Sequence, residues 1–186
     1  MAITKITELA HWIWKRYIPE GAHVLDATAG NGVDTEFLRE LVGEGGLVYA
    51  MDIQKEAICR ARERIPVEKR SNIRFITGDH RNLDLYIEGR IRAAVFNLGY
   101  LPRSEHQVRT RAESSLEAME KALERLSEEG ILSVAAYLAH DEGEEYREVR
   151  RFLAALDSKR YKVIEIDPIN QSKFSPKLLI CQKMGT

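Results

Sequence analysis

Polar side chains follow the successive apolar runs of this chain, at the point where each run ends. The carboxylates Asp26, Asp52 and Asp79 and the amide of Asn97 occupy this position. The carboxyl ends of parallel strands share one edge of a sheet, and ligands of open α/β sheets bind outside that edge. We therefore expect these side chains to meet at one site. His80, Tyr100, Tyr137 and His140 follow the same run ends and are further candidates.

The loop after Asp26 is built from small residues and carries glycines at positions 30 and 32. A helical pattern follows it, with Phe37 and Leu38 on one face. A strand, a tight glycine loop and a helix start bring backbone amides close to a cofactor. Asp52, at the end of the next apolar run, is in the place where a ribose diol is usually bound.

The third glycine of the dinucleotide-binding fingerprint is replaced by Thr35 in this chain. The spacing of Asp26, the two glycines and Asp52 instead resembles that of class I S-adenosylmethionine-dependent methyltransferases. This resemblance implies that S-adenosylmethionine is the cofactor and that the glycine loop surrounds its amino-acid end. The expected cofactor-binding residues are Asp26, Thr28, Ala29, Gly30, Asn31, Gly32, Asp34, Asp52, Gln54, Asp79, His80 and Asn97.

Several of these residues have a second interpretation: Asp52 can be a simple loop carboxylate, and Asp79 with His80 can be structural. Asp34 either contacts the cofactor or is an acid in the first turn of a helix, where the helix dipole favours a negative charge. Gln54 either reaches the ribose or adenine or caps a helix. Asp52 is expected to accept both ribose hydroxyls, and Asp79 and His80 are expected to lie near the adenine.

A second motif is Asn97-Leu98-Gly99-Tyr100. It stands where amino-group methyltransferases carry Asp/Asn-Pro-Pro-Tyr/Phe, in which an oxygen orients the attacking nitrogen and the aromatic ring stacks on the target base. Leu98 and Gly99 replace the two prolines, which argues against a planar exocyclic base amine as the acceptor. Tyr100 can still stack on a base.

Most of the chain, from about Thr7 to Lys183, resembles one bacterial family. The resemblance is carried by the segments 26–35, 52–54, 96–102 and 169–171, which read DATAGNGVDT, DIQ, FNLGYLP and INQ. The family is the MnmM-type tRNA 5-aminomethyl-2-thiouridine methyltransferases, formerly named rRNA methylases. It implies N-methylation of the aminomethyl group at the wobble uridine of tRNA. Alternatives are a methyltransferase acting on rRNA or a small-molecule amine, or a nucleotide-binding protein without catalysis.

The family often shows Tyr-His-Gly-His where this chain has Tyr137-Leu138-Ala139-His140, so only the second histidine is present. An aliphatic amine is mostly protonated at neutral pH and must lose a proton before it can attack. We expect Asn97 to orient the amine, Tyr100 to stack on the thiouracil and His140 to be the base. His80, Asp141 or desolvation alone are the alternatives to His140.

Composition limits the partners. The chain has 186 residues and a formal net charge of −1, so no global basic field holds nucleic acid. We expect local contact with the tRNA anticodon loop, through basic residues after the second motif and in the last loop. These residues are Arg103, His106, Arg109, Arg111, Lys173 and Lys177. A homodimer is plausible from the family alone.

No apolar run approaches the length of a membrane span, and the first residues lack a signal-peptide pattern, so a cytoplasmic enzyme without a membrane partner is expected. The two cysteines, Cys59 and Cys181, lack metal-ligand spacing and are expected to be buried thiols. No metal site is expected.

Apolar runs alternate with helical periodicity, which predicts a single α/β domain over residues 1–186 with a mainly parallel sheet. Strands are expected at 23–26, 46–51, 73–77, 93–96, 131–137, 161–166 and 178–181, and helices at 3–17, 55–65 and 146–156. A further helix carries Leu116 and Leu123 and is expected to stop at Gly130. The last two strands should form an antiparallel hairpin. The family resemblance implies a Rossmann-like methyltransferase sheet of order 3-2-1-4-5-7-6.

Overall fold

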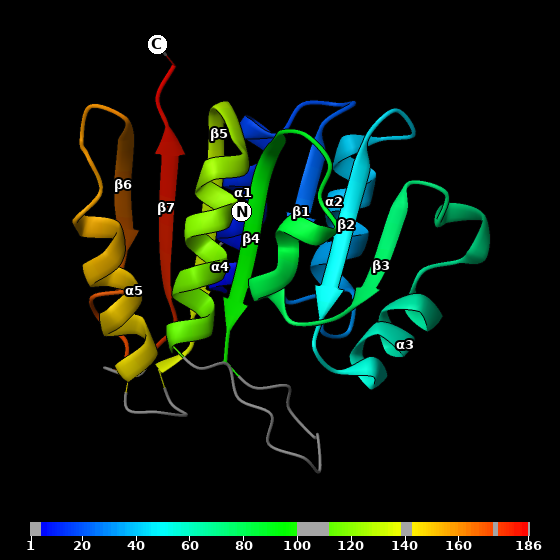
Figure 1. The fold of residues 1–186 in the computed structure, drawn as a ribbon. Coiled ribbons are helices and arrows are strands. Elements are labelled where there is room, and N and C mark those ends of the chain that lie inside the picture. The colour runs from blue at the N-terminus through cyan, green and yellow to red at the C-terminus, as the bar shows by residue number, and fades with distance from the viewer. Residues whose placement is uncertain (1–4, 100–111, 139–142, 173–174, 186) are drawn as a thin grey trace.

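A seven-stranded sheet runs through the protein in the order β3-β2-β1-β4-β5-β7-β6 (Figure 1). This computed structural model describes residues 5–99, 112–138, 143–172 and 175–185. The strands are β1 (His23–Asp26), β2 (Leu47–Asp52), β3 (Ile73–Thr77), β4 (Ile91–Leu98), β5 (Leu126–Ala136), β6 (Tyr161–Ile166) and β7 (Lys177–Lys183). The expected strand order and fold class are confirmed.

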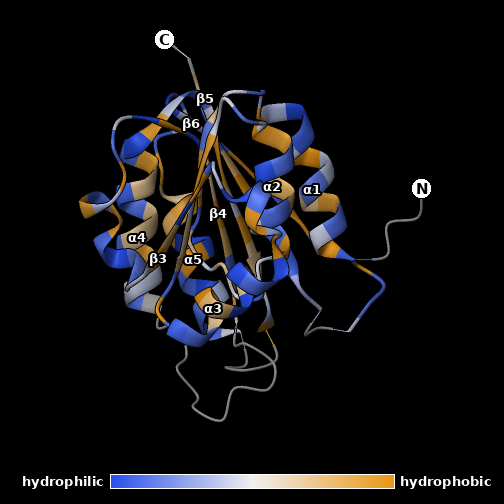
Figure 2. Cartoon of the chain, turned by 90° about the vertical axis from the view of Figure 1, so that its right-hand side faces the viewer, coloured by the Kyte–Doolittle hydropathy of each residue, from blue (hydrophilic) through white to orange (hydrophobic). Residues whose placement is uncertain are grey.

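Helices cover both faces of the sheet. The α-helices are α1 (Ile6–Tyr17), α2 (Val33–Val42), α3 (Lys55–Arg64), α4 (Ala112–Arg125) and α5 (Glu144–Ala154), and the short 3-10 helices are η1 (Val67–Lys69) and η2 (His80–Leu85). One apolar cluster joins the sheet to α1, α2 and α3, and a second joins it to α4, α5 and η2. Figure 2 shows the apolar strands between amphipathic helices that turn their polar sides outward.

Buried apolar residues on both faces of the sheet explain the uninterrupted apolar runs in the sequence. In β4, Val95 and Phe96 are both buried, and they belong to the two different clusters. Successive side chains of a strand point to opposite faces, so a strand covered on both sides needs apolar residues at every position. The parallel strands β1 to β4 thus end at the same edge, where their polar residues stand (Figure 1).

The last two strands pair antiparallel, as expected. Ile164 of β6 is opposite Ile180 of β7, and Val134 of β5 is opposite Leu179 of β7. Strand β7 therefore runs against both of its neighbours. Strand β6 therefore ends and β7 begins at the carboxyl edge of the sheet, on the same side as the ends of β1 and β4 (Figure 1).

The expected end of the fourth α-helix at Gly130 is wrong. Helix α4 ends at Arg125, and β5 begins at Leu126, which pairs with Ile91. A Cβ on Gly130 would lie 2.9 Å from the carbonyl oxygen of Ser127 and 3.0 Å from that of Arg92. Gly130 is thus needed because two backbones approach each other closely inside the sheet. In the sequence, a glycine in this place looks the same as one that caps a helix.

The two cysteines differ in environment. Cys181 is buried in β7, and burial raises the pKa of its thiol to about 12. Cys59 lies exposed on α3, which corrects the expectation that both thiols are buried. Within the described ranges, the helices are too short or too polar to cross a bilayer.

Candidate functional site

Asp26 ends β1 with a fully buried carboxylate. Its Oδ2 accepts a hydrogen bond of 2.6 Å from the hydroxyl of Thr35, and its Oδ1 accepts one of 3.3 Å from the amide of Thr28. Burial, followed by the nearby carboxylate of Asp34, raises the pKa of Asp26 from 3.8 to about 7, although the two hydrogen bonds oppose the shift. Thr35, which replaces the third glycine of the dinucleotide-binding fingerprint, is therefore a hydrogen-bond partner of Asp26.

Asp52 ends β2 and ties together two segments at the edge of the sheet. One oxygen accepts the amide of Gly30 at 2.9 Å, and the other accepts the amide of Gln54 at 2.9 Å. Burial raises the pKa of Asp52, and these two hydrogen bonds partly offset the effect. Each carboxylate oxygen has a second lone pair. The arrangement therefore leaves acceptor capacity for two further donors, such as the hydroxyls of a diol.

The glycine loop is held in a conformation that a side chain would disturb. Gly30 and Gly32 have φ values of 53° and 77°, in the left-handed region. A Cβ on Gly32 would lie 2.8 Å from the Cα of Ala61 in α3. The two glycines thus combine an unusual backbone conformation with tight packing against the neighbouring helix, as in loops where the backbone approaches a ligand.

Asp34, in the first turn of α2, is the centre of a side-chain cluster. Its Oδ1 lies 2.6 Å from Nε2 of His11 in α1, and its Oδ2 accepts a hydrogen bond of 2.6 Å from Nδ2 of Asn97 at the end of β4. Three elements thus converge on one carboxylate. The sequence suggested that Asp34 either contacts the cofactor or interacts with the helix dipole. Neither interpretation included a contact with His11 or Asn97.

His11 is a residue of the site that sequence reasoning missed. Its ring stacks on Phe37 with centroids 3.8 Å apart and an angle of 11° between the planes. Contact with Asp34 bridges 23 positions of the chain, which no local pattern reveals. The only available signal is a histidine beside the apolar residues of an amphipathic helix.

Asn97 is also tied to the glycine loop. Its backbone amide donates a hydrogen bond of 2.7 Å to the hydroxyl of Thr28. Next to it, the amide of Tyr137 donates to the carbonyl of Leu98, and a Cβ on Gly99 would lie 3.4 Å from the Cβ of Tyr137. Burial, and secondarily Asp34, raises the pKa of Tyr137.

Asp79 and His80 lie at the start of η2, after β3. Asp79 accepts hydrogen bonds from the backbone and side chain of Arg81. Although burial acts to raise the pKa of Asp79, these bonds outweigh it and lower the pKa. Burial lowers the pKa of His80, whose ring packs edge-on against Phe96 with centroids 5.8 Å apart.

His80 and the side chain of Asn97 lie on opposite faces of the sheet. Phe96 belongs to the apolar cluster of α4 and α5, whereas Asn97 reaches Asp34 in α2. Adjacent side chains of a strand point in opposite directions. The structure thus brings Asp26, Thr28, Asp34 and Asn97 together and separates His80 from the Asn97 amide.

The remaining expected residues fall into two groups. Gln54 is at the N-terminal boundary of α3 but makes no capping hydrogen bond with its side chain, and Asn31 is exposed on the loop. Lys177 pairs with Asp167 at 2.5 Å and its side chain is only 12% exposed, so it is not free for a phosphate, contrary to expectation. Tyr100, Arg103, His106, Arg109, Arg111, His140, Asp141 and Lys173 lie outside the described residues.

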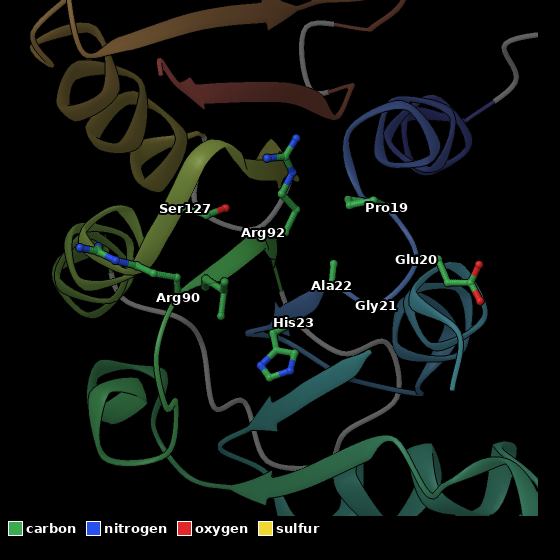
Figure 3. Close-up of a pocket in the computed structure, with 9 residues that line it drawn as sticks. Pro19, Glu20, Gly21, Ala22, His23, Arg90, Arg92 and Ser127 are labelled. Carbon is green, nitrogen blue, oxygen red and sulfur yellow. The ribbon is translucent and has the colours of Figure 1, made fainter. Parts of the chain in front are cut away.

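A shallow pocket of about 410 Å³ lies at the opposite edge of the sheet (Figure 3). It is lined by residues at the amino ends of β1 and β4, among them His23, Arg90 and Arg92. The guanidinium groups of both arginines are engaged with backbone carbonyls, that of Arg90 with Glu124 and that of Arg92 with Tyr17 and Glu128. The chemistry-bearing residues at the carboxyl edge do not contribute to this pocket.

An antiparallel strand β7 between β5 and β6, together with the glycine loop after β1, defines a class I S-adenosylmethionine-dependent methyltransferase fold. Comparison with known proteins agrees. The Clostridium thermocellum structure titled "putative rRNA-methylase" superposes with a TM-score of 0.94 at 38% identity, covering 99% of this chain and all of that one. The chain belongs to the family described as "Putative rRNA methylase", which it matches over residues 48–182.

Two further relatives add to this comparison. A Streptococcus mutans protein described as "a putative methyltransferase", solved in complex with S-adenosylhomocysteine (SAH), superposes with a TM-score of 0.89 at 33% identity, covering 98% of this chain and all of that one. The Arabidopsis thaliana protein named chloroplastic tRNA (mnm(5)s(2)U34)-methyltransferase is 35% identical over 156 residues, or 78% of this chain. The matched part spans 57% of the length of the plant protein.

The residues at the carboxyl edge fit the cofactor of this class. Asp52 keeps acceptor capacity for a diol, as described above. The positive φ values of Gly30 and Gly32 set the path of the loop, and the absence of a side chain on Gly32 lets the loop pack against Ala61 of α3. A carboxylate that can accept from a ribose diol and a glycine loop after the first strand suit the nucleoside part and the amino-acid part of S-adenosylmethionine.

Proposed function

We propose that this protein N-methylates the 5-aminomethyl group of 5-aminomethyl-2-thiouridine at the wobble position of tRNA. The observation that carries the proposal is the placement of Asn97: an amide at the end of β4, bonded to Asp34 and to the glycine loop, followed by Leu98 and Gly99. The name of the plant relative supports the same acceptor.

In this proposal the residues after β1 and β2 hold the cofactor. Asp52 accepts the ribose hydroxyls, while Gly30, Asn31 and Gly32 enclose the amino-acid end. Asp79 and His80 remain our candidates for the adenine. When bound, S-adenosylmethionine supplies a methyl group on a positively charged sulfur, which a neutral amine can attack.

The residues after β4 and β5 receive the acceptor. The amide oxygen of Asn97 accepts an N–H of the amine and fixes the direction of its lone pair. Placement of the reacting atoms within van der Waals contact accounts for much of the rate in such a reaction. Tyr100 stacks on the thiouracil, as aromatic side chains do on unstacked bases of single-stranded RNA.

The amine must be neutral before it attacks. His140 is our candidate to take the proton, because it comes soon after the end of β5 in the sequence. The alternative base His80 is less suited, since its ring lies against Phe96 on the other face. Desolvation near Leu98, which is buried, also favours a neutral amine.

The test uses purified protein, S-adenosylmethionine with a labelled methyl group, and tRNA that carries 5-aminomethyl-2-thiouridine. Mass spectrometry of the nucleosides should recover the label in 5-methylaminomethyl-2-thiouridine. An unmodified transcript of the same tRNA is the matched control and should remain unlabelled. Label on adenine or guanine, on rRNA instead of tRNA, or equally on the unmodified transcript would show that the acceptor is wrong.

A further inference from the structure

The cluster of His11, Asp34 and Asn97 joins α1, α2 and β4. Asp34 is 9% exposed, and each of its two oxygens has one protein partner, His11 from α1 and Asn97 from β4. A contact with the amino acid of the cofactor would need neither of these partners. The hydrogen bond to Asn97 instead links Asp34 to the end of β4.

Chemistry fixes the orientation of the Asn97 amide. An ionised carboxylate has only acceptors, so the atom of Asn97 that faces Asp34 at 2.6 Å must be the donor Nδ2. The amide is planar, so Oδ1 then points away from Asp34. With the backbone amide of Asn97 held by Thr28 at 2.7 Å, both the position and the rotation of this side chain are determined.

His11 determines the orientation of Asp34 in the same way. Nε2 of the histidine is 2.6 Å from Oδ1 of Asp34, where Nε2–H donates, and the ring is stacked on Phe37. The side chains of His11 and Asp34 are 21% and 11% exposed, so water competes weakly with this contact. The stacked ring of His11 thus orients the carboxylate of Asp34, and this carboxylate orients the side-chain amide of Asn97.

We propose that Asp34, oriented by His11, is the positioning residue that turns Oδ1 of Asn97 toward the acceptor amine. This inference rests on the proposed function, because it assigns Asn97 to the acceptor. It adds a role for α1, whose contribution to the site is otherwise only packing. It also explains why an acid in the first turn of α2 is linked to two elements beyond its own helix.

Activity measurements on an exchanged pair provide the first test. Asp34→Ala should lower kcat on tRNA bearing 5-aminomethyl-2-thiouridine by about a hundredfold, the effect of a misplacement of about 1 Å. Its affinity for S-adenosylmethionine by calorimetry should stay close to that of the wild type. Asn97→Asp places two carboxylates face to face and should be similarly impaired.

The double variant Asp34→Asn with Asn97→Asp reverses the donor and the acceptor and restores the hydrogen bond, so kcat should recover by at least about tenfold over either damaged variant. Within the same helix, Glu36→Gln is the matched control. Glu36 pairs with Arg64 on the surface, so this change from acid to amide should leave kcat unchanged. His11→Gln, which keeps a donor at a similar reach, should retain more activity than His11→Ala.

A second readout needs no acceptor. The side-chain amide of Asn97 can be identified in a ¹⁵N spectrum by its loss in Asn97→Asp, and its hydrogen exchange should accelerate in Asp34→Ala. If the wild type does not methylate this tRNA, the proposed function fails, while this exchange measurement still decides the role of Asp34. Unchanged exchange in Asp34→Ala, or no recovery in the double variant of an active enzyme, would overturn the inference.

Discussion

The buried carboxylate of Asp26 makes the stability of the cofactor-free protein depend on pH in an unusual direction. Burial and the neighbouring Asp34 raise the pKa of Asp26 to about 7, from 3.8 in an exposed state. Between about pH 4 and pH 7 the folded protein holds a proton that the unfolded chain has released. Stability therefore falls as the pH rises through this window, and the full cost is present above about pH 7.

The magnitude follows from the two pKa values. At about 1.36 kcal/mol for each pKa unit, a rise from 3.8 to about 7 corresponds to a destabilisation of at most about 4 kcal/mol at high pH. Asp26→Asn has the same shape and stays neutral, and its amide can still hydrogen-bond with Thr35. At pH 8 the variant should exceed the wild type by up to about 4 kcal/mol, at pH 5 by roughly 1.6 kcal/mol, and below about pH 4 the two should be nearly equal.

Urea unfolding of both cofactor-free proteins at pH 5, 6, 7 and 8 would measure this difference. Contributions of the other acids are common to both proteins and cancel. Asp79→Asn is a control of opposite sign, because hydrogen bonds from Arg81 overcome the effect of burial and lower the pKa of Asp79. A difference between wild type and Asp26→Asn that does not change with pH would refute the reasoning.

Three further predictions concern the cofactor, the acceptor and the loop. Asp52→Ala should weaken binding of S-adenosylmethionine by about 1.5–3 kcal/mol in calorimetry, since hydrogen bonds to a charged group are lost. Asn97→Ala should leave that affinity nearly intact but lower kcat about a hundredfold in a labelled-methyl assay. Gly32→Ala should reduce the free energy of unfolding by about 2–4 kcal/mol, through a strained φ and a clash with Ala61. Gly89→Ala, with a φ of 74° and open space around it, should show the strain alone.

Much of the fold was predictable because apolar runs and helical periodicity directly reflect burial. The strand order was not available from periodicity and came from the family resemblance. Gly130 misled because a glycine after a helical pattern is typical of a helix end, whereas here the close approach of Arg92 and Ser127 requires it. A steric requirement set by another strand leaves no local signal.

The position of a candidate residue was predictable where it depends only on the end of one strand. Asp26, Asp52 and Asn97 were expected at the carboxyl edge and lie there. The link between His11 and Asp34 was not predictable, because it depends on how α1 packs beside α2. Lys177 is an example of a residue that the sequence favoured wrongly. Its charge indicated a nucleic-acid contact, but its ammonium group forms an ion pair with Asp167.

The hydrogen bond between Thr28 and the backbone of Asn97 has a consequence for how such a chain can diversify. It joins the loop after β1 to the end of β4, and these two strands are neighbours in the sheet. In the function proposed above, the sheet itself would thus align the cofactor with the acceptor. The loop between β6 and β7 contributes no atom to this hydrogen bond, so changes in its sequence can accumulate while the link between β1 and β4 is preserved.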